Sequence, residues 1–191
     1  MTVLVAGLLL FLGTHSVRIF ADEWRSAQIE RIGEKPWKAL YSLASVLGLG
    51  LIVWGYGMTR AEPALWQPPG WLRDAASALV LVSFVLIAAA YVPRNRIKAA
   101  LGHPMLAGVK TWAFAHLIAN GRPGDLVLFG AFLLWAILAF RSSRRRDRAA
   151  GKTYPAGALA GDVSTAVAGV VAWVVFAFWL HAWLIGVSPL A

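Results

Sequence analysis

Long apolar runs separated by short charged segments constrain this chain more than any other feature. The runs cover roughly residues 2–20, 38–58, 73–92, 104–119, 123–140 and 164–186. A helix of about 20 residues rises ~30 Å, which matches the hydrocarbon thickness of a bilayer. Because lipid offers no hydrogen bonds to the backbone, each run is expected to be a helix. The sequence predicts an all-α polytopic membrane bundle of about six transmembrane helices, in one domain over residues 1–191.

The composition supports a membrane protein and excludes several other classes. Of the 191 residues, 59% are hydrophobic and 14% are charged, whereas soluble domains carry about 25% charged residues. The net charge of +9 lies in loops between apolar runs, which indicates membrane topology and contact with anionic lipid rather than nucleic acid. The absence of cysteine excludes disulfides and thiolate-ligated metals.

The fourth run, 104–119, is the weakest candidate span. It contains Lys110 and His116, and 16 helical residues rise only about 24 Å. A short helix with two ionisable groups is expected to be shielded by its neighbours, tilted, or partly re-entrant.

The distribution of basic residues predicts the orientation. Apart from Arg60, Arg73, Lys110 and Arg122, every Lys and Arg lies before or at the first residue of the second run, between the third and fourth runs, or between the fifth and sixth. The positive-inside rule places these three segments in the cytoplasm and both termini on the outer side of the membrane. The two longest cytoplasmic segments, 21–37 and 141–163, are the expected surfaces for partner proteins.

Three histidines, His15, His116 and His181, fall in apolar surroundings. A single intramembrane histidine often links helices as a neutral hydrogen-bonding group. Three of them in a bundle without cysteine favour a ligand role for at least two. Paired imidazoles on different helices suit haem b, which is flat and apolar. Zinc is less favoured, because it would normally recruit further ligands and no acidic residue is expected near these histidines.

The neighbours of two of these histidines are compatible with a bound cofactor. Arg18 lies one turn from His15 towards the cytoplasm and is either a partner for a haem propionate or an ordinary basic residue at the membrane surface. Trp112 precedes His116 by one turn, and Ala113 leaves space for a flat ring or for close helix packing.

His103 has a different setting, at the predicted start of the fourth helix and directly before Pro104. Thirteen residues at 100° each place it about 220° around the helix from His116. A capping or interface role is therefore expected for His103, rather than a share in the same metal site.

The chain resembles the NnrU family of bacterial membrane proteins over nearly its whole length. The resemblance is most specific at Leu101–Lys110 continuing through Trp112, His116 and Asn120, and it extends to Gly13–Ser16 and Gly33–Lys38. The family is similar to the plant 15-cis-zeta-carotene isomerases, which are haem b membrane enzymes. The resemblance implies haem ligation by His15 and His116. The alternative cysteine ligand of the plant enzymes falls on Ala113, so their redox ligand switch has no counterpart here.

Several functions remain open at the level of sequence. The resemblance favours a haem b protein, either isomerase-like or a redox partner in nitrogen-oxide metabolism (denitrification), whereas helix depth alone would pair His116 with His181. A cofactor-free assembly or transport factor that contacts a hydrophobic small molecule is the second hypothesis. The third is a relic methyltransferase of the isoprenylcysteine type, although Gly102 replaces the arginine of that motif and a basic run around Asp147 stands where paired glutamates are expected.

The predicted topology can be tested with reporter fusions. A reporter joined after Arg148 is expected to be cytoplasmic, and one joined after Ala191 is expected to be periplasmic, because the basic segments are retained inside. Paired activity and protease-protection measurements check both positions. Inversion at both sites would overturn the orientation, and inversion at one would indicate an odd number of spans.

Overall fold

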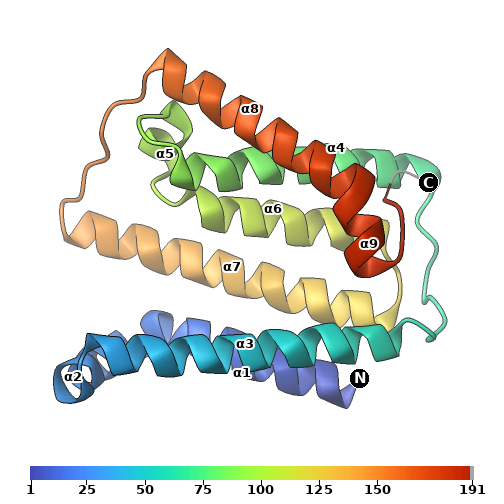
Figure 1. The fold of residues 1–191 in the computed structure, drawn as a ribbon, viewed down its shortest axis with the longest axis horizontal. Helices are drawn as coiled ribbons and strands as arrows, with labels where there is room; N and C mark the ends of the chain where they lie inside the picture. Colours follow the sequence, from blue (N-terminus) through green and yellow to red (C-terminus); the bar gives the residue numbers. More distant parts are fainter. Residues whose placement is uncertain (190–191) are drawn as a thin grey trace.

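The computed structural model describes residues 1–189, which form helices joined by short connections (Figure 1). The long elements are α1 (Thr2–Phe20), α3 (Glu34–Thr59), α4 (Gly70–Tyr91), α6 (Pro104–Ala119), α7 (Pro123–Ala149) and α8 (Leu159–Val175). Two short helices, α2 (Asp22–Ile32) and α5 (Arg96–Leu101), lie between them, and a π-helical turn, η1 (Phe176–Leu180), joins α8 to α9 (His181–Ile185). The expected all-α bundle is confirmed.

Five helical segments are long and apolar enough to cross a membrane: α1, α3, α4, α7 and the continuous segment from α8 to α9. Large apolar side chains cover their outer faces. Examples are Leu9, Val46, Trp54 and Trp183, which are 72%, 67%, 63% and 78% exposed. Such extensive apolar exposure is typical of a surface in contact with lipid.

Some helix boundaries differ from those predicted. α3 begins at Glu34 rather than at residue 38, and α7 continues past residue 140 to Ala149. The prediction of 141–163 as a connecting segment is therefore wrong for residues 141–149, which belong to α7, and for 159–163, which begin α8. The 21–37 segment contains α2. Apolar runs mark the membrane thickness, whereas arginine is a good helix former and cations are favourable at helix C-termini. A helix can therefore continue beyond the apolar run.

The short helix α6 lies between α4 and α7 in the bundle (Figure 1). Its side towards these neighbours carries small residues, and Ala107, Gly108, Ala113 and Ala115 are buried. Ser83 of α4 donates a hydrogen bond from Oγ to the carbonyl oxygen of Gly108 (2.8 Å). The expected shielding of this helix by its neighbours is therefore confirmed.

The closest helix pairing is between α1 and α3, and it depends on glycine. A Cβ atom added at Gly48 of α3 would lie 2.8 Å from the backbone nitrogen of Phe11, and one added at Gly7 of α1 would lie 2.6 Å from that of Ile52. Helices in lipid gain little from the hydrophobic effect, so small residues and close van der Waals contact hold them together.

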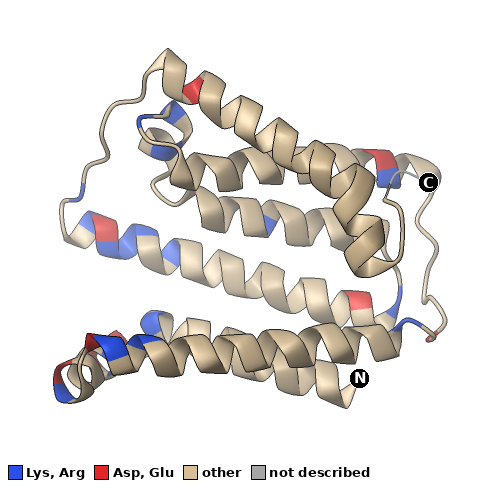
Figure 2. Ribbon diagram, viewed as in Figure 1, with Lys and Arg blue, Asp and Glu red and all other residues tan. Residues whose placement is uncertain are grey.

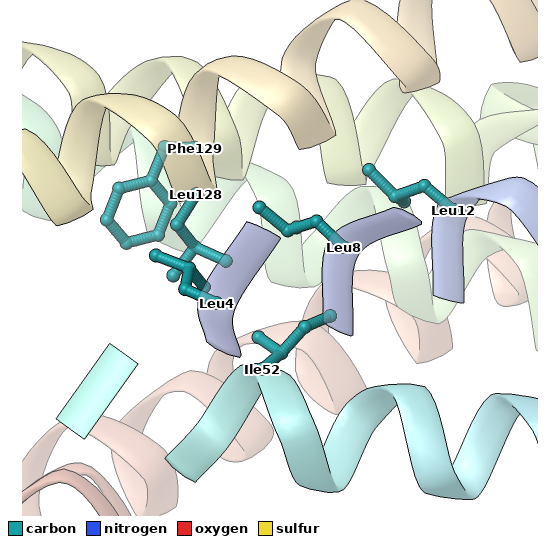
Figure 3. Packing of buried hydrophobic residues seen from close by; sticks show 6 residues of the cluster. All are labelled: Leu4, Leu8, Leu12, Ile52, Leu128 and Phe129. Atoms are coloured by element: carbon teal, nitrogen blue, oxygen red, sulfur yellow. The ribbon is translucent and has the colours of Figure 1, made fainter. Parts of the chain in front are cut away.

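The largest apolar cluster links this pair to α7. Figure 3 shows Leu4, Leu8 and Leu12 of α1 between Ile52 of α3 and the pair Leu128 and Phe129 of α7. The three leucines recur every four residues, so they form one stripe along α1. α7 consequently joins the α1–α3 pair to the remaining helices, through its separate contacts with α6.

Charged residues concentrate at the ends of the bundle (Figure 2). Most Lys and Arg residues lie at the end that holds α2, α5 and the C-terminal turns of α7, and the start of α1 lies at the opposite end. This separation is what the predicted topology requires. Ala191, the position of one predicted fusion, lies outside the described residues.

The glycine contacts yield a matched pair of substitutions on α3. Gly48→Ala is expected to lower the free energy of unfolding by about 1–3 kcal/mol, because the added methyl group collides with the α1 backbone. Gly50→Ala is expected to be neutral or slightly stabilising, because a Cβ there meets no atom of a neighbouring helix within 4 Å and alanine favours helix. Thermal unfolding in detergent measures both, and equal effects would refute the close approach.

Candidate functional site

A cavity of about 670 Å³ lies between α4, α6 and the segment from α8 to α9. Most of its wall is apolar and includes Val80, Phe84, Ile87, Trp173, Phe176 and Ala177. Two histidines, His116 and His181, line it from different helices. Gln67, Arg73 and Asn120 provide polar groups on its border. Apolar cavities of this size with a few polar groups are typical of sites for small organic molecules.

His116 is held rigidly within α6. Its Nδ1 lies 2.9 Å from the carbonyl oxygen of Trp112, one turn earlier. Its ring packs against Phe129 at a centroid distance of 4.5 Å. Because a carbonyl only accepts hydrogen bonds, Nδ1 carries the proton and Nε2 keeps its lone pair. Within residues 1–189, Nε2 of His116 has no hydrogen-bond partner, so it is available as a ligand.

His181 has the same arrangement on another helix. Its Nδ1 lies 2.6 Å from the carbonyl oxygen of Val187, which again leaves Nε2 with the lone pair. The π-helical turn η1 ends directly before His181. Such turns change the helical phase of the residues that follow and occur often at functional sites. The span 164–186 was predicted as one regular helix, and that prediction did not include this change of phase.

His15 lies outside this cavity, between α1, α3 and α7. Its ring stacks on Phe11 at 4.2 Å and contacts Tyr41 at 5.1 Å and Trp135 at 6.0 Å. Its Nδ1 lies 2.7 Å from the carbonyl oxygen of Phe11, so Nε2 is again the atom left for a ligand. The neighbouring Trp135 has a buried indole N–H for which the described part of the chain provides no acceptor.

The structure brings His116 and His181 to one cavity and separates both from His15. Aromatic rings connect the two environments: Phe11 contacts Phe132 at 5.9 Å, and Phe132 contacts Trp112 at 5.6 Å. Trp112 in turn lies 5.1 Å from the ring of His116. His15 and His116 are thus linked through three aromatic side chains rather than by direct contact.

The other predicted site residues fall in different places. Trp112 lines the cavity beside His116, as expected from its position one turn earlier. Ala113 is completely buried and is not part of the cavity wall. The side chain of Arg18 is 61% exposed and lies 4.0 Å from Asp22, so it belongs to the surface at the basic end of the bundle.

Two charged residues near this site, Arg73 and Asp125, were not predicted from the sequence. Arg73 lines the cavity, although its position in the sequence indicated only a loop boundary. Asp125 is buried in the first turn of α7, accepts a hydrogen bond from Tyr56 (2.7 Å) and interacts electrostatically with His116. The expectation that no acidic residue lies near these histidines is therefore wrong. Asp125 lies three residues after Arg122, a spacing that matches a helix-capping pattern. This spacing could have indicated from the sequence that Asp125 lies in the first turn of a helix.

A second polar cluster joins His103, Asp147 and Tyr154 at the basic end of the bundle. Nε2 of His103 lies 2.8 Å from Oδ2 of Asp147, and the Tyr154 hydroxyl donates to the same oxygen at 2.6 Å. Burial raises the pKa of Tyr154 to about 12, and its hydrogen bond to Asp147 adds to the shift. The side chain of His103 thus ties α6 to α7 and to the segment after α7, and it makes no capping hydrogen bond to α6.

Gly102 is required by this cluster. Its φ of +73° is unfavourable for residues with side chains, and a Cβ there would lie 2.8 Å from the ring of Tyr154. An arginine before the histidine, as in the methyltransferase motif, would not fit. This part of the chain therefore departs from that motif for a structural reason.

Comparisons with known proteins identify the family. The family model described as NnrU protein matches residues 3–189. Comparisons with curated proteins and with solved structures found no match. Within residues 1–189, no group of three or more histidine, cysteine or acidic side chains is placed to hold a metal ion. The match spans nearly the whole chain, helices and both polar sites included, and the chain therefore belongs to the NnrU family.

Proposed function

We propose that this NnrU-family membrane protein binds haem b in the cavity between α4, α6 and α9, where His116 and His181 would hold the iron. One observation carries the proposal: two histidines from different helices line one apolar cavity, and each has its Nδ1 bonded to a backbone carbonyl. That bond fixes the ring orientation and leaves Nε2 to coordinate iron.

The remainder of the cavity fits the same group. The apolar wall from α4 and α8 suits the macrocycle, and its volume of about 670 Å³ lies in the usual range for small-molecule sites. Arg73 lines the cavity and has no ion-pair partner within residues 1–189. A guanidinium group is well suited to bind a propionate, so Arg73 replaces Arg18 as the proposed partner for this group.

Bound haem would supply a redox-active iron, and the chain would determine how that iron is held. His116 and His181 would hold it between two helices, and the apolar wall would limit access of water. We propose a redox or isomerase-type role on a hydrophobic small molecule, within nitrogen-oxide metabolism. Ala113 provides no thiolate, so the ligand exchange of the plant isomerases is not part of this proposal.

The topology indicates from which side of the membrane the cavity would be reached. With the basic end of the bundle in the cytoplasm of a bacterial cell, both termini and the cavity lie on the periplasmic side of the inner membrane. Gln67 and Asn120 border the cavity near the ends of α4 and α6. A redox partner protein or a small molecule would therefore reach the site from the periplasm or from the outer leaflet.

A pairing of His15 with His116 is the alternative implied by family resemblance. Its support is the unpartnered indole N–H of Trp135 beside His15 and the free Nε2 of His15. In the structure His15 and His116 do not line a common cavity, and their rings are linked only through Phe11, Phe132 and Trp112. The His116–His181 pairing is favoured because both side chains line one cavity.

Single histidine substitutions distinguish the two pairings. His116→Ala and His181→Ala are each expected to remove the low-spin haem spectrum, because alanine has no imidazole nitrogen to hold the iron and only one histidine of the pair would remain. His15→Ala is expected to retain the parental spectrum. His103→Ala is the matched control, since it alters a histidine of the same helical region outside the cavity. Absorption spectra of purified, haem-loaded protein provide the measurement.

The outcomes separate the hypotheses. Loss of low-spin haem in His15→Ala and His116→Ala, but not in His181→Ala, would select the family pairing. Parental spectra in all three variants would reject haem ligation by any of these histidines. A parent that binds no haem would favour a cofactor-free protein, whose cavity accepts a hydrophobic small molecule directly.

The proposed propionate partner yields a separate prediction. Arg73→Gln is expected to weaken haem retention about two- to tenfold, because it removes a charged hydrogen-bond donor from the cavity border. Arg18→Gln is expected to have no effect, since Arg18 lies at the opposite end of the bundle. The rate of haem transfer to apomyoglobin measures retention. A loss caused by Arg18→Gln alone would instead place the haem beside His15.

A further inference from the structure

A second cavity lies at the opposite, basic end of the bundle, between the C-terminal turns of α1 and α7. Its volume is about 710 Å³. Arg141, Arg144, Arg145 and Arg148 line it together with Ser142. The remaining wall is apolar and consists of Ile19, Phe20 and Phe140. This cavity therefore combines a cluster of guanidinium groups with an apolar surface, at the end of the bundle where Figure 2 shows basic residues on α7.

The four arginines are not neutralised by the protein. Within residues 1–189, none of them forms an ion pair with a carboxylate. The one acidic residue of this run, Asp147, is held by His103 and Tyr154, and its other oxygen lies 3.9 Å from Lys152. The His103–Asp147–Tyr154 cluster thus engages the one carboxylate of this run, and the positive charge of the four arginines is uncompensated within the described residues.

The fifth arginine of the run holds the two walls of the cavity together. Nη1 of Arg146 donates hydrogen bonds to the carbonyl oxygen of Arg18 (3.2 Å) and to Oγ of Ser142 (2.8 Å). Its Nη2 donates to Oγ of Ser143 (3.0 Å). Arg146 therefore fixes the end of α1 against α7, so that the arginines and the apolar wall face the same space.

We propose that this cavity is a binding site for an anionic phospholipid, with the phosphate on the arginines and an acyl chain along Ile19, Phe20 and Phe140. Guanidinium groups bind phosphate oxygens through paired, charge-assisted hydrogen bonds. Basic pockets at the cytoplasmic ends of membrane helices suit anionic headgroups. The apolar wall selects an amphiphile over a soluble phosphate, and the 72% exposure of Phe20 allows an acyl chain to continue into the bilayer.

Two double substitutions of equal charge test the site. Arg141→Gln with Arg145→Gln removes two charges from the cavity wall and spares Arg144, which also donates to the carbonyl oxygen of Leu101. Arg31→Gln with Lys35→Gln removes two exposed charges at the same end of the bundle but outside the cavity. Native mass spectrometry of the full chain, delipidated and then titrated with phosphatidylglycerol or phosphatidylcholine of equal chain length, measures lipid affinity.

The parent and the control are expected to bind phosphatidylglycerol at least tenfold more tightly than phosphatidylcholine. The cavity variant is expected to lose affinity for phosphatidylglycerol about ten- to thirtyfold, with little change for phosphatidylcholine. Equal losses in the two double variants would overturn the proposal in favour of general surface attraction. Displacement of phosphatidylglycerol by millimolar glycerol 3-phosphate or inorganic phosphate would also overturn it, because the ligand would then be a soluble phosphate. Neither outcome depends on haem.

Discussion

The structure depends on one constraint: a backbone in lipid must satisfy its own hydrogen bonds, and helices there gain little from the hydrophobic effect. Helices must therefore be held together by close contact. Gly7 and Gly48 provide it between α1 and α3, and the buried small residues of α6 provide it between α4 and α7. This close fit allows a helix of only 16 residues to occupy the interior of the bundle, where it presents His116 to a cavity.

The three histidines in apolar surroundings share one local device. Each Nδ1 lies within hydrogen-bonding distance of a backbone carbonyl. In His15 and His116 this carbonyl is one turn earlier, where the helix itself places it, whereas His181 uses Val187 beyond the end of α9. This hydrogen bond gives Nδ1 an acceptor that lipid could not provide, and it leaves Nε2 without a competing partner. A histidine that serves only as a link between helices would be expected to bond a neighbouring helix instead, and none of these three does.

The two ends of the bundle have different chemistry, and α7 connects them. At one end, its buried Asp125 bonds Tyr56 near the cavity that holds His116 and His181. At the other end, its last turns carry the arginines of the basic cavity, and Asp147 is bound to His103 and Tyr154. The same helix thus packs Phe129 against His116 behind the first cavity and supplies the arginines of the basic cavity at its other end. The acidic residues of α7 take part in internal bonds at both ends, so neither cavity contains an unpaired carboxylate from this helix.

The sequence by itself determined the helical bundle, the position of α1, the bounds of α6 and the separation of basic residues, because apolar length and charge are read directly from the order of residues. It also identified the three histidines as unusual, and the helical phase of His103 relative to His116 indicated that these two do not share a site. The extension of α7 to Ala149 was missed because helix formation does not end with apolarity. Only the tertiary structure decided which histidines share a cavity. The π-helical turn changes the phase before His181, and three aromatic rings separate His15 from His116. Arg73 lines the cavity, and Asp147 bonds His103 and Tyr154. Both arrangements depend on contacts between segments far apart in the chain, which local sequence patterns do not encode.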